Sequence, residues 1–135
     1  MYQIITDGSW DMGSERAARF GVEVVPYYVT MDGEHYLKEI KELDVRDFYQ
    51  FMVDNPKTFP KTSLPTVQDY YDVFEKYAKQ GIDIICFTLS AKFSGSYNSA
   101  RNAGSMILEN YPDIRVTVMD TTLATLMQGL MIQEI

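Results

Sequence analysis

Four short segments of the sequence are rich in hydroxyl-bearing and small residues. They are Asp7-Gly8-Ser9, Lys61-Thr62-Ser63, Ser90 to Ser96 and Asp120-Thr121-Thr122. Serine and threonine hydroxyls donate hydrogen bonds without carrying charge, and a glycine such as Gly95 lets the backbone approach a ligand closely. Helix N-termini add backbone amides that favour anions. These residue types therefore indicate a site that holds an anion with neutral donors.

These segments lie at the ends of expected strands and helices. Apolar runs at residues 2–6, 82–89 and 115–119 are typical of strands, and the run at 82–89 is nearly continuous, as in a strand buried on both faces. Apolar residues recur at helical spacing over 14–20, 44–55, 66–81, 97–111 and 123–135. Strands and helices that alternate in this way predict an α/β fold: a three-layer sandwich with a mainly parallel sheet flanked by helices.

The stretch between the first two expected helices has a different pattern. Residues 22–31 are rich in valine and tyrosine and predict a strand, followed by a hairpin-type turn at Asp32-Gly33 and a short return strand at 35–37. Residues 57–65 contain two prolines and predict a loop.

Ligands of open parallel sheets bind in the crevice beyond the carboxyl ends of the strands. We therefore expect the polar segments that begin at Asp7, Ser90 and Asp120 to converge at one edge of the sheet. The loop that carries Thr62 precedes a helix and is expected to join them.

Composition narrows the classes of partner and the cellular setting. The chain has 135 residues, the size of one domain, with 46% apolar residues and a net charge of -7. An acidic surface repels nucleic acids and anionic membranes, so neither is an expected partner. The single cysteine excludes an intrachain disulfide and favours a cytoplasmic setting. No apolar run is long enough for a transmembrane segment, and the first residues lack the pattern of a signal peptide.

Each candidate residue also has a purely structural interpretation. Ser9, Ser94 and Thr66 stand where helix caps and turn residues are common. Asp7 and Asp120 follow strands and can serve the same purpose. Their joint placement at one sheet edge is what raises the case for a site.

A search for enzyme motifs and metal ligands leaves only one alternative function. The sequence contains no G-x-G-x-x-G, Walker-type or G-x-S-x-G motif. The only histidine, His35, follows a turn with no cysteine or second histidine at metal-ligand spacing, and Cys86 lies inside an apolar strand as a core residue. Asp7 and Asp11 could hold magnesium, so the alternative is a metal-dependent phosphatase or phosphotransferase that uses this pair.

The chain resembles the DegV family, the fatty acid-binding proteins of the fatty acid kinase system, over essentially its whole length. Two motifs carry most of the resemblance: PKTSLP at residues 60–65 and LSAKFSGSYNSA at residues 89–100. The opening strand into Asp7, the stretch GVEVVP at 21–26 and the turn at Asp32-Gly33 add to it.

The resemblance implies a lipid-binding carrier rather than an enzyme. Residues 1–135 would form the N-terminal α/β domain of a two-domain protein about twice as long, with a long-chain fatty acid bound between the domains and no other cofactor or metal. Thr62 and Ser94, with the Gly95 amide nearby, would hold the carboxylate, and a fatty acid kinase would phosphorylate it to an acyl phosphate. Further candidate pocket residues are Asp7, Ser9, Ser63, Ser96, Asp120 and Thr121.

Three places depart from the family pattern, and the end of the sequence bears on its completeness. Gly8 stands where serine usually follows the first aspartate, Lys38-Glu39 replaces an acidic residue and a glycine, and Thr121 replaces a serine. The helical pattern over 123–135 stops without a C-cap signal, as expected for a fragment of a longer protein or for a frayed terminal helix. An isolated half is also expected to self-associate through its open apolar face.

Overall fold

The computed structural model describes all 135 residues and contains two separate sheets. The larger sheet is entirely parallel and has the strand order β2-β1-β6-β7. Its strands are β1 (Tyr2–Asp7), β2 (Glu23–Val25), β6 (Asp83–Thr88) and β7 (Val116–Asp120). The predicted strands at 2–6, 82–89 and 115–119 are therefore confirmed to within a residue or two.

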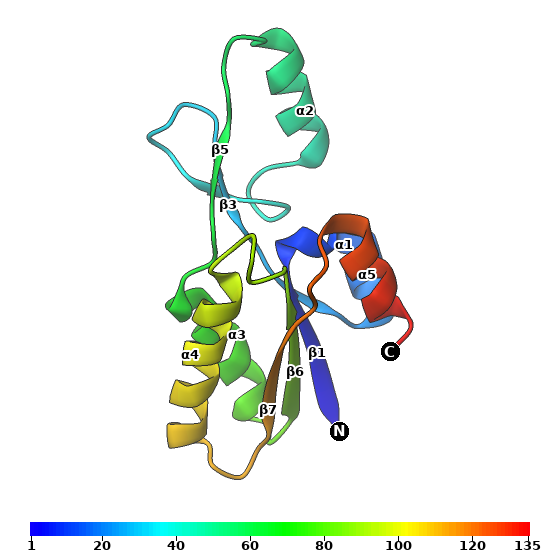
Figure 1. Cartoon of the computed structure of the whole chain (residues 1–135), viewed down its shortest axis with the longest axis vertical. Helices are drawn as coiled ribbons and strands as arrows, with labels where there is room; N and C mark the ends of the chain where they lie inside the picture. The colour runs from blue at the N-terminus through cyan, green and yellow to red at the C-terminus, as the bar shows by residue number, and fades with distance from the viewer.

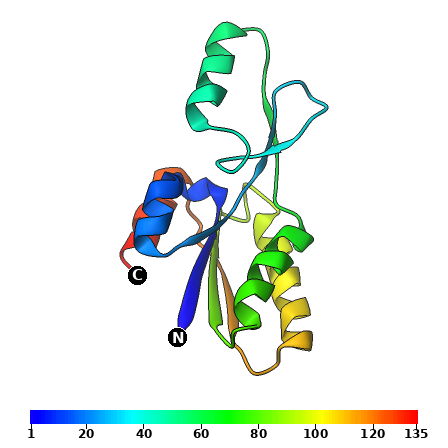
Figure 2. The ribbon, with the colours of Figure 1, turned by 180° about the vertical axis from the view of Figure 1, so that it is seen from behind.

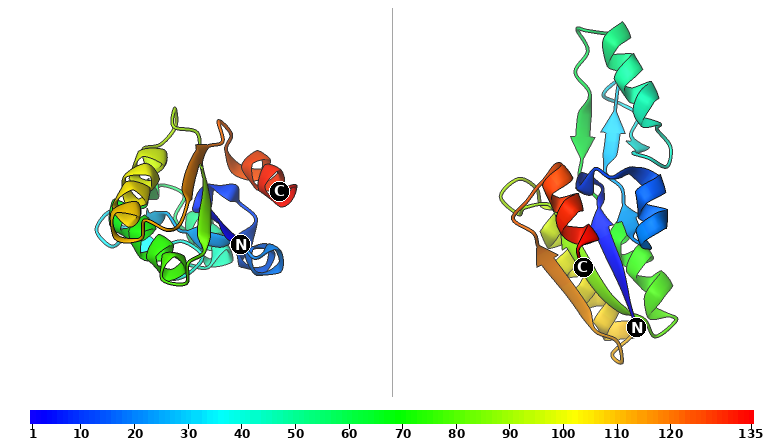
Figure 3. Two further views of the ribbon diagram at one scale, coloured as in Figure 1. Left: turned by 90° about the horizontal axis from the view of Figure 1, so that it is seen from below. Right: turned by 90° about the vertical axis from the view of Figure 1, so that its right-hand side faces the viewer.

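Helices cover both faces of the parallel sheet, which confirms the predicted three-layer sandwich (Figure 1). One face carries α3 (Val67–Ala78) and α4 (Ser96–Asn110), and the other carries α1 (Gly13–Phe20) and α5 (Thr125–Gln133). The view along the sheet in Figure 3 separates the three layers clearly. No helix is both long enough and apolar enough to cross a bilayer.

The alternation of side chains along the strands divides the core between the two faces. Ile5, Ile84 and Cys86 are buried against α3 and α4 in the larger cluster. Their neighbour Phe87 points the other way and packs in a smaller cluster that contains Trp10. A central strand with apolar residues at consecutive positions is the pattern of a sheet covered on both sides. The burial of Cys86 is confirmed.

A second lobe projects from the sandwich at the end of the sheet where the strands point (Figures 1 and 2). It contains the helix α2 (Val45–Asp54) and a small antiparallel sheet with the order β4-β3-β5. The strands of this sheet are β3 (Tyr28–Thr30), β4 (Leu37–Lys38) and β5 (Lys61–Ser63).

The prediction of one strand over residues 22–31 was wrong. The chain forms β2 in the large sheet, leaves it, and forms β3 in the small sheet. Pro26 lies at the break, and proline interrupts a ladder because it has no N–H to donate. The predicted return strand at 35–37 is displaced to β4, and Asp32 closes the turn by accepting from two backbone amides rather than by a two-residue hairpin.

The prediction of a loop over residues 57–65 was also wrong in part. β5 forms inside this segment and pairs with β3 in register Val29↔Thr62. The strand is only three residues long and exposed, and prolines flank it at positions 60 and 65. Short polar edge strands of this kind carry no apolar alternation that a sequence pattern can reveal.

Candidate functional site

The carboxylate of Asp7 joins four elements at the end of the parallel sheet. Its Oδ1 atom accepts from Ser9 Oγ at 2.5 Å and from Gln128 Nε2 at 3.0 Å. Its Oδ2 atom accepts from the Leu89 amide at 2.9 Å and from Ser96 Oγ at 2.9 Å. Asp7 is fully buried, so these four donors replace water around a charge that the core would otherwise exclude. The residue positions the loops after β1 and β6 and the start of α4.

This geometry does not support the metal-dependent alternative. Every hydrogen bond of the Asp7 carboxylate goes to a donor of the chain, while Asp11 is exposed. No three side chains of the types that ligate metals come together anywhere in the structure. His35 also lies on the surface, where its ring contacts Asp32 at 2.6 Å.

Ser94 Oγ accepts hydrogen bonds from two donors and carries one proton of its own. Tyr27 OH donates to it at 3.2 Å, and the Ser96 amide donates to it at 3.2 Å. The oxygen of a hydroxyl accepts two hydrogen bonds and donates one. Both acceptor positions are taken from within the chain, and the Ser94 hydroxyl donates no hydrogen bond there, so its proton is free to be donated elsewhere.

Two further donors beside Ser94 are also free. The Thr62 hydroxyl and the Gly95 amide make no hydrogen bond within the chain. The two loops meet at Leu64, because a β-carbon built on Gly95 would lie 3.6 Å from Leu64 Cδ2. The structure thus brings the Thr62 and Ser94 segments together, although no hydrogen bond joins the two residues.

Thr62 lies on the wall of a cavity of about 470 Å³ between the two lobes. Its apolar walls come from Val29, Ile40, Leu43, Val45, Phe48 and Tyr49. The rest of its lining consists of Gly8, Asp11, Gly13, Glu39, Asp44 and Thr62. A cavity lined by both apolar and polar residues suits an amphiphile better than a fully polar ligand.

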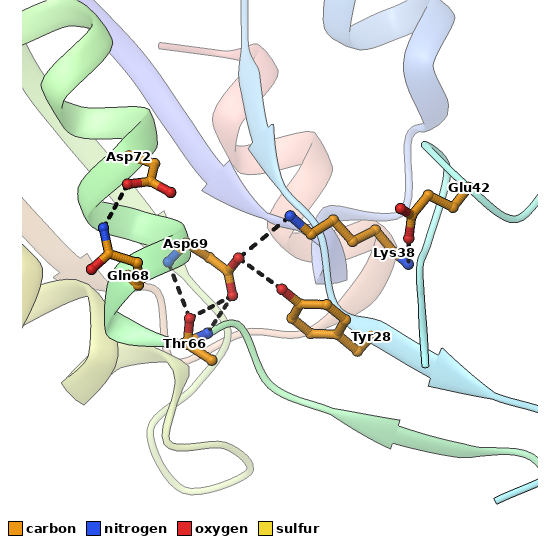
Figure 4. Close-up of polar contacts among 7 residues, drawn as sticks. All are labelled: Tyr28, Lys38, Glu42, Thr66, Gln68, Asp69 and Asp72. Atoms are coloured by element: carbon orange, nitrogen blue, oxygen red, sulfur yellow. Dashed lines mark hydrogen bonds and ion pairs between the residues drawn. The ribbon is translucent and has the colours of Figure 1, made fainter. Parts of the chain in front are cut away.

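Figure 4 shows how the Thr62 strand is fixed at its end. Thr66, which stands at an expected cap position, begins α3 with a capping box, in which its hydroxyl accepts from the Asp69 amide and the Asp69 carboxylate accepts from the Thr66 amide. Asp69 Oδ1 also accepts from Tyr28 OH at 2.8 Å and lies 3.5 Å from Lys38 Nζ. The capping carboxylate therefore ties the projecting lobe to the sandwich.

The remaining predicted residues have internal or solvent-facing roles. Asp120 accepts from the amides of Ala91 and Thr122, and Thr121 Oγ1 donates to the Thr88 carbonyl at 2.8 Å. These bonds hold the loop after β7 against the end of β6. The Ser9 hydroxyl lies within hydrogen-bond distance of Asp7 and Gln128, while Ser63 is exposed on β5 with no side-chain partner.

Two ionisable groups at the site have displaced pKa values. Burial, reinforced by the nearby charge of Asp7, raises the pKa of the Tyr27 phenol to about 12. Burial also raises the pKa of the Glu39 carboxyl, against the hydrogen bond that it accepts from the Tyr27 amide. The Tyr27 phenol therefore keeps its proton and remains a donor to Ser94 at neutral pH.

The sequence patterns missed three residues that shape the site. Tyr27 lies in the segment that was expected to be a single strand, Glu39 follows the expected hairpin and was noted only as a departure from the family pattern, and Gln128 lies on α5. Gln128 Nε2 donates to Asp7 across 121 residues of sequence, which no local pattern can show. The sequence showed Gly8 and Glu39 as two separate departures from the family pattern, and only the structure shows that they are in contact.

Comparison with known proteins identifies relatives over the full sequence. A family model described as an uncharacterised protein of the DegV family matches residues 1–135. A DegV domain-containing protein of Clostridium perfringens is 35% identical over 132 residues, which is 98% of this chain and 46% of the relative.

Solved structures give the same result. A stearic acid-binding protein from Eubacterium ventriosum superimposes with a TM-score of 0.95 at 45% identity, over 99% of this chain and 46% of that chain. A fatty acid-binding DegV family protein from Thermus thermophilus gives 0.79 at 29% identity, over 98% and 45%. The chain thus spans about half the length of the proteins it matches. From its sequence and its fold, the chain belongs to the DegV family.

Proposed function

We propose that this chain binds a long-chain fatty acid and holds its carboxylate with the Thr62 hydroxyl, the Ser94 hydroxyl and the Gly95 amide. The observation that carries the proposal is that Ser94 Oγ accepts from Tyr27 and from the Ser96 amide but donates no hydrogen bond within the chain. Relatives from Eubacterium ventriosum and Thermus thermophilus that bind fatty acids support it.

The chemistry of these donors fits a carrier. Hydroxyls and amides stabilise a carboxylate without taking a proton from it, and the buried carboxylate of Asp7 is saturated by its own donors. The proposed role is to present the carboxylate to a fatty acid kinase, which would transfer a phosphoryl group to it and form an acyl phosphate. The setting we propose for this role is the cytoplasm.

We propose that a second domain completes the acyl pocket. The relatives are about twice as long as this chain, which spans 46% of the stearic acid-binding protein. Leu126, Met127 and Leu130 of α5 are each about half exposed, and such an apolar surface is suited to a further domain or to a second copy of the chain.

The test is the affinity for palmitate, measured by isothermal titration calorimetry in two single variants. Ser94→Ala and Thr62→Ala each remove one hydrogen bond to a charged group, worth about 1.5–3 kcal/mol, so each should weaken binding by about 10- to 150-fold. Ser99→Ala is the matched control, because Ser99 lies on α4, the helix that follows the Ser94 loop, and its side chain has no hydrogen bond. Folded Ser94→Ala and Thr62→Ala variants that bind palmitate like the wild type would refute the assignment.

A further inference from the structure

Glu39 occupies space that a side chain at position 8 would otherwise fill. A β-carbon built on Gly8 would overlap Glu39 Oε1 and would lie 2.7 Å from the Glu39 carboxyl carbon. The same Oε1 atom accepts a hydrogen bond from the Tyr27 amide at 2.9 Å. The carboxyl group of Glu39 is therefore held against the end of β1 by a glycine and a backbone amide.

The Glu39 carboxyl group is linked to both residues that are proposed to hold the ligand. Glu39 and Thr62 line the same cavity. Tyr27 connects Glu39 to Ser94, since its amide donates to Glu39 and its hydroxyl donates to Ser94. A fatty acid carboxylate bound at Thr62 and Ser94 would therefore add a second negative charge to the region that Glu39 borders.

The charges around Glu39 are mostly negative. Asp7 on β1 and Asp11 after it both oppose its ionisation. Asp44 at the start of α2 lines the same cavity, and Glu23 of β2 and Lys41 line the neighbouring cavity that Glu39 also borders. Lys41 is the only basic residue on either wall, and no basic residue lines the cavity that contains Thr62.

We propose that Glu39 couples the binding of a fatty acid carboxylate to proton uptake by the Glu39 carboxyl group. This inference rests on the proposed function and adds a regulatory property to the same site. The ligand arrives with its negative charge and shifts Glu39 toward its protonated form, which takes its proton from solvent and lowers the summed negative charge of the pair.

The sign of the effect follows from linkage. A bound carboxylate disfavours the ionised form of Glu39, so protonated Glu39 must in turn favour the bound carboxylate by the same factor. Affinity is then highest at a pH where Glu39 is protonated and declines as the pH rises through its pKa, which burial already holds above the ordinary value. The repulsion between two like charges about 10 Å apart, at an effective dielectric constant of about 20, lowers the affinity roughly tenfold.

The experiment measures dodecanoate binding to the wild type, E39Q and the control E34Q by isothermal titration calorimetry across a pH series. E39Q keeps an oxygen for the Tyr27 amide and removes the charge, while Glu34 is exposed on the loop before β4. The ratio of the two affinities at each pH cancels the titration of dodecanoate itself. We expect E39Q to bind about tenfold more tightly than the wild type at high pH and equally at low pH, with E34Q following the wild type.

Two outcomes would overturn the inference, and they are distinguishable. Equal affinities of the wild type and E39Q at every pH would refute the role of Glu39 while leaving fatty acid binding intact. Failure of all three proteins to bind dodecanoate would refute the proposed function and this inference with it. Calorimetry in two buffers of different ionisation enthalpy adds an independent readout, because only the wild type and E34Q should take up the extra proton.

Discussion

Removal of the Ser96 hydroxyl tests whether the hydrogen bonds of the buried Asp7 carboxylate stabilise the fold. Ser96 is fully buried at the start of α4, where its Oγ atom donates to Asp7 Oδ2 and lies 2.6 Å from Tyr70 OH. The Ser96→Ala variant deletes both bonds and leaves the remaining donors of Asp7 in place. It removes one of the four hydrogen bonds to the Asp7 carboxylate and leaves that buried carboxylate in place.

The expected loss of stability follows from these two bonds. A hydrogen bond to a charged group contributes about 1.5–3 kcal/mol, and a buried hydroxyl left without a partner costs about 1–3 kcal/mol. Alanine is a better helix former than serine by about 0.5 kcal/mol, which offsets a little of this. We therefore expect Ser96→Ala to lower the free energy of unfolding by about 2–5 kcal/mol.

The assay is urea unfolding, followed by circular dichroism and by the fluorescence of Trp10, which is fully buried. Ser99→Ala provides the control for a serine-to-alanine change on the same helix. A loss below about 0.5 kcal/mol in Ser96→Ala, equal to that of the control, would show that the Asp7 network does not stabilise the fold, because such values are typical of surface substitutions.

Three further changes test separate parts of the structure. The Tyr27 phenol, with its pKa raised to about 12, should contribute stability that is present below pH 10 and is lost as the pH rises toward 12. Tyr27→Phe should remove one step near pH 12 from an ultraviolet tyrosine titration, and a titration that keeps this step would contradict the burial of Tyr27. Gly129→Ala should destabilise the fold by about 1–3 kcal/mol, because a β-carbon there would overlap the Trp10 carbonyl oxygen, and an unchanged urea midpoint would exclude that close contact. Thr66→Ala should lower stability by about 0.5–2 kcal/mol through loss of the capping box, whereas Thr58→Ala in the exposed loop should not, and equal effects of the two would argue against the cap.

Local patterns predicted the parallel sandwich well because its elements follow from nearby residues. The nearly continuous apolar run that became β6 needs only burial on both faces to be a strand. Gly21 ends α1 in the left-handed conformation that glycine favours, and Thr66 with Asp69 forms a capping box. The two cap signals span four residues or fewer, and the apolar run of β6 is one continuous segment.

The projecting lobe could not be predicted in the same way. β5 has only the residues Lys61, Thr62 and Ser63, all exposed, and its pairing with β3 depends on a partner more than thirty positions earlier in the sequence. Pro26 marks the exit from the large sheet, but the valine and tyrosine residues around it favour strand on both sides.

The candidate site shows the same division between local and distant information. Hydroxyls and glycine in the Thr62 and Ser94 segments indicated neutral donors from residue type alone. Which hydroxyl keeps a free proton depends on Tyr27, whose position follows from the break between β2 and β3. The fit of Glu39 against Gly8 likewise requires the three-dimensional structure.

The central claim is that Ser94 offers its proton to a lipid carboxylate. Native mass spectrometry of the purified chain, followed by organic extraction, measures this most directly when the sample is first mixed with palmitate at a concentration that just fills the wild-type site. We predict a complex with one palmitate per chain in the wild type and in Ser99→Ala, and a much lower palmitate occupancy in folded Ser94→Ala. Equal palmitate occupancy in Ser94→Ala and the wild type would contradict it.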